Sequence, residues 1–131
     1  MKSQTFIGDG NDMYSLKVVV ESKTAYPSWR VDCTIKIYLR YHYRNLPHTS
    51  NIDIFVNIKA NEYEDSKDVN FTNNEYVLIE TFEGSMWYDD EGQFTDVLNV
   101  NIQPNDSSTL LSLKEPITLD PLPDQIGRAH V

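Results

Sequence analysis

The sequence predicts an all-β protein, an antiparallel β-sandwich of the immunoglobulin-like or jelly-roll-like kind with extended N- and C-terminal arms. Apolar and polar residues alternate with a period of two along most of the chain, which is typical of strands that bury one face. Turn-forming residues interrupt this alternation at short intervals, and no segment shows a convincing helical period. The 131 residues, 40% of them hydrophobic, suffice for one domain with its own core.

Residues 14–20 form the first predicted strand, because their even-numbered positions are apolar and the others mostly polar. The clearest alternation follows at residues 29–44, which would span about 50 Å when extended. A compact domain of this size has a radius of gyration of only roughly 14 Å. We therefore expect this strand either to bend across both sheets or to project as a hairpin with residues 52–60, its tip at residues 44–51. Its apolar face comprises Trp29, Val31, Cys33, Ile35, Ile37, Leu39, Tyr41 and Tyr43.

The second half of the chain carries further strands, separated by turn-forming residues. Asp96 falls on the apolar side of its segment, which indicates a bulge or a strand end there. The last strand is broken at Pro116, and a short helix at residues 107–114 is the alternative. The acidic segment 61–67 is expected to be a loop. The expected strands are residues 52–60, 69–71 (a brief edge strand), 76–82, 94–103 and 110–119.

The ends of the chain are expected to lie outside the sandwich. Residues 1–12 form the predicted N-terminal arm, residues 13–120 the sandwich domain, and residues 121–131 a C-terminal linker or arm. Pro121 and Pro123 support the last assignment, because proline cannot donate a ladder hydrogen bond.

The charge balance restricts the class of partner. Asp and Glu total 20 against 11 for Lys and Arg, a formal net charge of -9. Nucleic acids and anionic membrane surfaces attract cationic proteins, so neither is expected as a partner. A basic stripe nevertheless follows one side of the long strand, where it can meet an acidic patch on a partner protein. The stripe comprises Arg30, Lys36, Arg40 and Arg44.

The sequence also carries information about processing. Cys33 is the single cysteine, so no intrachain disulfide is expected. The first ten residues have no apolar core of signal-peptide length, and no apolar run approaches the roughly 20 residues of a membrane helix. We expect synthesis in a reducing cytoplasm without a signal peptide, for an intracellular protein or a virus-particle component.

No enzyme, metal site or cofactor is expected. His42, His48 and His130 do not form a ligand cluster, and Cys33 lies mid-strand on the apolar face as a core residue. The carboxylates at residues 62–68 and 89–91 are interpreted as solvated acidic turns. Calcium binding and glycoside hydrolysis are the alternatives for these turns, although nothing in the sequence directs two carboxylates into one cleft.

Aromatic residues favour recognition of a partner. Several lie off the apolar faces of their strands, where tyrosine and tryptophan favour protein interfaces or stack on sugars. The candidates for sugar stacking are Tyr38, Tyr63, Trp87 and Tyr88. The predicted interface comprises Tyr38, Arg40, His42, Arg44, Leu46, His48, Trp87, Tyr88, Ile126 and Arg128.

A family resemblance points the same way. The segment MWYDDEGQFT at residues 86–95 combines an aromatic pair with an acidic, glycine-containing turn, an alternating strand follows at residues 97–102, and TLDPLP ends the pattern at residues 118–123. This arrangement resembles β-sandwich domains of tail and other virion structural proteins of tailed bacteriophages.

The resemblance implies a non-enzymatic structural or adhesion module, either tail-associated or a capsid decoration. It implies docking on other virion proteins, homo-oligomerisation and location in the virion after synthesis in the host cytoplasm. The alternative function is a carbohydrate-binding module that contacts a host surface glycan.

Overall fold

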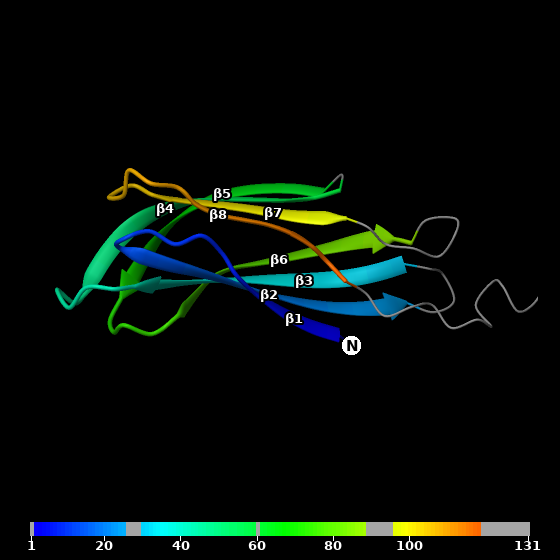
Figure 1. Ribbon diagram of the computed structural model, residues 1–131, viewed down its shortest axis with the longest axis horizontal. Helices are drawn as coiled ribbons and strands as arrows, with labels where there is room; N and C mark the ends of the chain where they lie inside the picture. The colour runs from blue at the N-terminus through cyan, green and yellow to red at the C-terminus, as the bar shows by residue number, and fades with distance from the viewer. Residues whose placement is uncertain (1, 26–29, 60, 89–95, 119–131) are drawn as a thin grey trace, which may run out of the picture.

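The computed structural model describes residues 2–25, 30–59, 61–88 and 96–118, and these residues form eight β-strands and no helix. Two four-stranded antiparallel sheets, ordered β1-β2-β3-β6 and β5-β4-β7-β8, pack face to face as a sandwich (Figure 1). The predicted fold class, an antiparallel β-sandwich, is therefore confirmed. The strands are β1 (Lys2–Ile7), β2 (Tyr14–Ala25), β3 (Arg30–Tyr41), β4 (His48–Ile58), β5 (Asn61–Phe71), β6 (Val77–Trp87), β7 (Val97–Pro104) and β8 (Leu111–Pro116).

The core lies between the two sheets and consists of the apolar half of each alternating strand. Along β3 every odd-numbered residue from Val31 to Tyr41 is buried, whereas Asp32 and Arg40 on the opposite side are exposed. Cross-strand neighbours share a face, so the fully buried Ile37 lies beside the fully buried Val18 of β2. The predicted inward and outward faces are confirmed within β3. Tyr43, also expected on the apolar face, lies beyond the strand and is 45% exposed, and Trp29 lies outside the described residues.

Neither outcome predicted for residues 29–44 occurs: they form no hairpin with residues 52–60, and β3 ends at Tyr41 and lies in one sheet only. β3 pairs with β2 and β6, while β4 lies in the second sheet between β5 and β7. The chain crosses between the sheets at residues 42–47, which contain a cis peptide bond between Leu46 and Pro47. Each of the two strands has one apolar face. Placed in opposite sheets, these faces cover each other, whereas a projecting two-stranded hairpin would leave them in water.

The N-terminal segment differs from the expected arm. β1 pairs with β2 along its whole length and forms one edge of the first sheet. Phe6 packs against the core, and the Gln4 side chain accepts a hydrogen bond from the backbone N–H of Thr118 (3.1 Å). These long-range contacts, which the local pattern does not reveal, draw the segment onto the sheet. The expected C-terminal arm, residues 121–131, lies outside the described residues.

β5 runs through the acidic segment 61–67 that is expected as a loop, and residues 69–71 are only its last part. The inward positions of its first half carry polar side chains such as Tyr63 and Lys67, which conceals the alternation. Lys67 forms an ion pair with Glu80 of β6, whose side chain is only 3% exposed. Because β5 and β6 belong to different sheets, this ion pair joins the sheets along one side.

The end of the described chain agrees with the sequence. β8 forms within the segment expected as the last strand, so the alternative helix at residues 107–114 is wrong. β7 begins directly after Asp96, where a strand end is one of the two predicted outcomes. The backbone carbonyl of Asp96 accepts a hydrogen bond from Ile117 N (3.1 Å), which holds the two strands together beyond their ladder.

Candidate functional site

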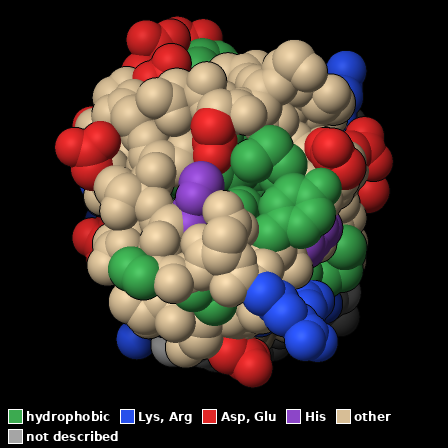
Figure 2. All heavy atoms as spheres, turned by 90° about the vertical axis from the view of Figure 1, so that its left-hand side faces the viewer, with side chains coloured by type: hydrophobic (Ala, Val, Ile, Leu, Met, Phe, Trp, Pro, Cys, Tyr) green, Lys and Arg blue, Asp and Glu red, His purple; other side chains and the backbone are tan. Residues whose placement is uncertain are grey.

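Most of the predicted interface residues gather at one end of the sandwich. Three lie in the crossing between the sheets, two on the outer side of β3 beside it, and one at the start of β4. Figure 2 shows this end face-on, with hydrophobic and histidine side chains near its centre and a group of Lys and Arg side chains at one side. The residues at this end are Tyr38, Arg40, His42, Arg44, Leu46 and His48. Ile126 and Arg128 lie outside the described residues.

The remaining aromatic candidates do not join this group. Trp87 lies where β6 ends, at the opposite end of the sandwich, and is 52% exposed. Tyr88 is buried and its hydroxyl lies 3.1 Å from Oγ1 of Thr24, so its ring is not presented to a partner. The Tyr63 ring packs on that of Phe82, with centroids 5.5 Å apart. No shared stacking platform arises from these three aromatic residues.

A basic and aromatic cluster lies on the outer face of the first sheet. Nζ of Lys17 lies 4.8 Å from the ring centroid of Tyr38 and 4.4 Å from that of Tyr76, both within the range of cation–π attraction. Leu78 lies opposite Tyr38 and is 48% exposed, and Arg40 is exposed on the same face of β3. We call these five residues the basic–aromatic patch. Only Tyr38 and Arg40 are among the residues that the sequence predicts for an interface, because the other three come from β2, from β6 and from the residue before β6.

Hydrogen bonds hold the patch in place. Nε of Arg40 donates to the backbone carbonyl of Asn74 (2.6 Å), and the Asn74 amide donates to the carbonyls of Tyr41 (3.0 Å) and Tyr43 (2.7 Å). The connection at residues 72–76 is thereby tied to β3 and to the start of the crossing. A surface that is already ordered loses less conformational entropy when a partner binds.

Two members of the basic stripe, Arg30 and Lys36, are paired with neighbouring carboxylates. Nη2 of Arg30 lies 3.2 Å from Oδ2 of Asp32, and Nζ of Lys36 lies 2.6 Å from Oε1 of Glu21. The hydrogen bond that Lys36 donates to Glu21 raises the pKa of Lys36, while hydrogen bonds that Asp32 accepts from Ser85 and then Arg30 lower the pKa of Asp32. These two basic side chains are therefore engaged within the sheet. The Arg40 bond, by contrast, goes to an uncharged carbonyl, so positive charge remains at the basic–aromatic patch.

The two outer faces of the sandwich carry opposite charge. The register places alternate residues of each strand on these faces. The outer face of the first sheet carries Lys17, Lys23, Arg30, Lys36 and Arg40 against Glu21, Asp32 and Glu83. The outer face of the second sheet carries Asp53, Glu62, Glu64 and Asp68 against Lys114. Although its net charge is -9, the molecule therefore has one basic and one acidic outer face.

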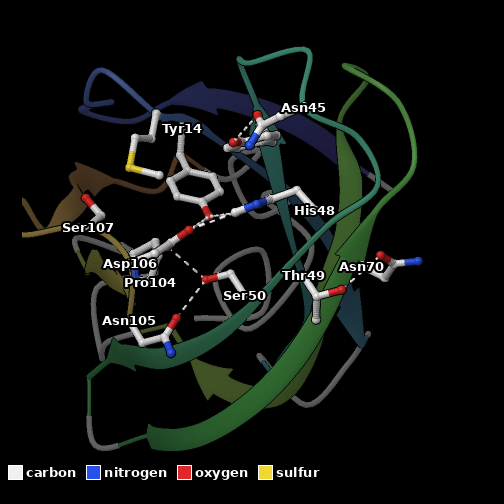
Figure 3. A network of polar contacts seen from close by, with 12 residues as sticks. Tyr14, Asn45, His48, Thr49, Ser50, Asn70, Pro104, Asn105, Asp106 and Ser107 are labelled. Carbon is white, nitrogen blue, oxygen red and sulfur yellow. Dashed lines mark hydrogen bonds and ion pairs between the residues drawn. The ribbon is translucent and has the colours of Figure 1, made fainter.

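A hydrogen-bonded network closes the same end of the sandwich (Figure 3). The Asp106 carboxylate, between β7 and β8, accepts hydrogen bonds from the hydroxyls of Tyr14 (2.9 Å) and Ser50 (2.9 Å). Nε2 of His48 lies 2.7 Å from the same carboxylate, and the His48 ring stacks on Tyr41 with centroids 3.9 Å apart. The network joins β2, β4 and the β7–β8 connection, and thus both sheets.

The network contains the residue types of a hydrolytic triad, but its contacts differ from those of a triad. A catalytic serine must pass its proton to histidine. Ser50 instead donates to Asp106 and is 3% exposed, and His48 faces the same carboxylate. The arrangement holds a carboxylate in place and does not activate a nucleophile. We therefore assign the network a structural role in closing this end.

The pKa values in the network fit this role. Burial raises the pKa of Asp106, but hydrogen bonds from Tyr14, Ser50 and His48 outweigh burial and leave it below its ordinary value. Burial also raises the pKa of the Tyr14 hydroxyl, and the adjacent Asp106 carboxylate raises it further. At neutral pH, Tyr14 is a protonated donor and Asp106 an ionised acceptor, as the hydrogen bonds require.

Acidification is expected to destabilise the protein through Asp106. Its folded-state pKa lies below the unfolded value of about 3.9, so its contribution to stability is complete above that value and is lost as the pH falls through the folded pKa. Urea titrations at about pH 7 and about pH 3 should show a larger loss in the wild type than in Asp106→Asn, which does not ionise. Equal losses in the two proteins would contradict this assignment.

Among the residues that the structure describes, the remaining thiol and carboxylate groups form no candidate site. Cys33 is buried as predicted, and burial raises the pKa of its thiol to about 11, so the thiol stays protonated. Glu62, Glu64 and Asp68 point outward from a strand and not from a turn. Within the described residues, no group of three or more His, Cys, Asp or Glu side chains is placed to hold a metal ion.

Comparison with protein-family models, with curated proteins and with solved structures found no match for this chain. The part of the chain described here is an antiparallel β-sandwich with a basic–aromatic patch on one outer face and a hydrogen-bonded network at one end. It contains no helix long and apolar enough to cross a membrane. The fold therefore defines the class of this protein as an antiparallel β-sandwich.

Proposed function

We propose that this protein is a non-enzymatic structural or adhesion module of a bacteriophage virion, tail-associated or a capsid decoration, that acts by docking on other virion proteins. The observation that carries the proposal is the basic–aromatic patch, an ordered and partly apolar surface with positive charge on a chain of net charge -9. Its partner is an acidic surface on a neighbouring subunit, and copies of this chain are among the candidate subunits.

The composition of the patch suits an interface. Tyrosine and arginine are enriched where interfaces carry most of their binding energy, because they combine a large apolar surface with directed polar contacts. Burying Leu78, now 48% exposed, and the rings of Tyr38 and Tyr76 supplies the hydrophobic contribution. Lys17 and Arg40 supply charge that steers an acidic partner into a defined orientation.

Particle incorporation tests the proposal. In tagged chains expressed during infection by the source virus, Arg40→Glu should reduce the amount found in purified particles by about tenfold or more, equivalent to about 1.4 kcal/mol of docking energy. Lys23→Glu is the matched control, because it makes the same charge change on the same outer face near the other end of β2 and should retain incorporation.

Mass spectrometry of the purified particles measures the outcome, and thermal unfolding verifies that both variants fold. Absence of the wild-type chain from particles would refute the virion assignment. Equal incorporation of Arg40→Glu and Lys23→Glu would refute the role of the patch while leaving the location of the protein intact.

A further inference from the structure

A groove lies on the outer face of the second sheet, on the side of the sandwich opposite the basic–aromatic patch. It has a volume of about 520 Å³ and spans β5, β4 and β7. Phe55 of β4 lies opposite Glu64 of β5 and Asn101 of β7, and Asp53 lies opposite Gln103 in the next outward row. In Figure 1 these three strands lie in the upper layer, where β4 and β5 curve downward toward the left-hand end.

The groove has an aromatic residue between polar side chains, and the exposed Leu110 also lines it. The Phe55 side chain is partly exposed, and a carboxylate and a carboxamide flank it on the two neighbouring strands. In the described part of the chain, the side chains of Glu64 and Asn101 make no hydrogen bond with another residue. Carboxylates accept hydrogen bonds, and carboxamides both donate and accept them. The pairing capacity of these two side chains is therefore available to a ligand.

The strands that form the groove have an amino-acid composition that is unusual for β-strands. Asparagine is disfavoured in β-strands, yet it recurs on the outer face of the two central strands. These asparagines are Asn51, Asn57, Asn99 and Asn101. Local sequence choices that oppose the fold are expected where a surface serves recognition. Two of these amides already donate to carboxylates of β5, Asn51 to Asp68 (3.1 Å) and Asn57 to Glu62 (3.2 Å).

We propose that this groove binds an uncharged oligosaccharide. The apolar C–H face of a sugar ring stacks on the Phe55 ring, and its hydroxyl groups donate to the Glu64 and Asp53 carboxylates and pair with the Asn101 amide. The acidic lining repels sialylated and sulfated glycans, so the ligand is uncharged. The groove and the basic–aromatic patch lie on opposite faces, so one molecule can dock on a particle and hold a glycan at the same time.

A glycan array that carries neutral, sialylated and sulfated oligosaccharides, probed with the full chain, tests this proposal. Binding confined to neutral oligosaccharides is expected. Calorimetric titration with a bound oligosaccharide should then show affinity reduced by about tenfold or more in Phe55→Ala and in Glu64→Gln. Glu64 is exposed on β5, and glutamine keeps the shape of its side chain. Glu64→Gln therefore remains informative even if Phe55→Ala fails to fold.

Trp87→Ala is the matched control, because it removes an exposed aromatic ring from the other sheet and should leave the affinity unchanged. Three results would overturn the proposal: no binding of any neutral oligosaccharide, preferential binding of the anionic glycans, or loss of affinity in Trp87→Ala with full affinity in both groove variants. Arg40→Glu should bind the oligosaccharide normally, so failure of the docking proposal and failure of this one are distinguishable.

Discussion

Replacing Ile37 with aspartate is expected to lower the free energy of unfolding by roughly 4 kcal/mol or more, the largest stability effect foreseen for a single substitution here. Ile37 is fully buried in the centre of β3, beside Val18 of β2 and opposite the inner face of the second sheet. An aspartate there would either stay ionised without a partner or be protonated at a high energetic cost, and the packing of the isoleucine side chain would be lost as well.

Urea unfolding followed by circular dichroism measures this effect, with Thr81→Asp as the control. Thr81 is exposed on the outer face of β6, opposite Lys36, so the same new charge should change stability by no more than about 0.5 kcal/mol. A wild-type-like midpoint for Ile37→Asp would mean that the inner face of β3 is assigned to the wrong side.

Replacing Asp106 with alanine is expected to cost about 3 kcal/mol, the second largest effect. The substitution removes the shared acceptor of the Tyr14 and Ser50 hydroxyls and of His48. Tyr14 and Ser50 are buried, so their hydroxyls would be left without this partner where water has little access. The loss should be smaller than three separate hydrogen bonds, because members of a network do not contribute additively.

Asp32→Ala is the control for this prediction. Asp32 also accepts hydrogen bonds from a hydroxyl and a cation, Ser85 and Arg30, but it is exposed on an outer face. Water replaces such partners at little cost. Urea unfolding of both variants should therefore show a much larger destabilisation for Asp106→Ala. Similar midpoints would show that the end network contributes little to holding the two sheets together.

The stability of this end also bears on docking. Tyr41 stacks on His48 of the network, and its backbone carbonyl accepts a hydrogen bond from Asn74, whose own carbonyl holds Arg40. The network and the basic–aromatic patch are thus both linked to Tyr41. Asp106→Ala is therefore unsuitable as a docking variant, because reduced incorporation into particles could result either from unfolding or from loss of the interface.

How far the sequence predicts the fold depends on which side chains face inward. β3 is predicted almost to its ends, because its inward residues from Val31 to Tyr41 are uniformly apolar. β4 is predicted only from Ile52 onward, because its first inward positions, His48 and Ser50, are polar and conceal the alternation. β5 is mostly missed, because Tyr63, Asp65 and Lys67 face inward at the edge and find polar partners such as Glu80 and each other. An edge strand with this composition resembles a solvated loop until its cross-sheet partners are known.

The residues of the candidate sites also differ in whether the sequence pattern alone indicates them. Tyr38 and Arg40 are identifiable because they lie on the polar side of a strongly alternating strand. Lys17 and Tyr76 are not, since their proximity to Tyr38 depends on which strands flank β3. The Phe55 groove likewise requires β5 and β7 to lie on either side of β4. In each case the pairing of strands assembles the surface.

By itself, the sequence determined the sandwich class and the two faces of its clearest strands, because side chains of an extended chain alternate every second residue whatever the neighbours are. The tertiary structure alone decided that β3 and β4 belong to opposite sheets, and that Tyr14 meets Asp106, 92 positions away. Such contacts arise when apolar faces distant in sequence are buried against each other. That pairing is a property of the whole chain, which no local period encodes.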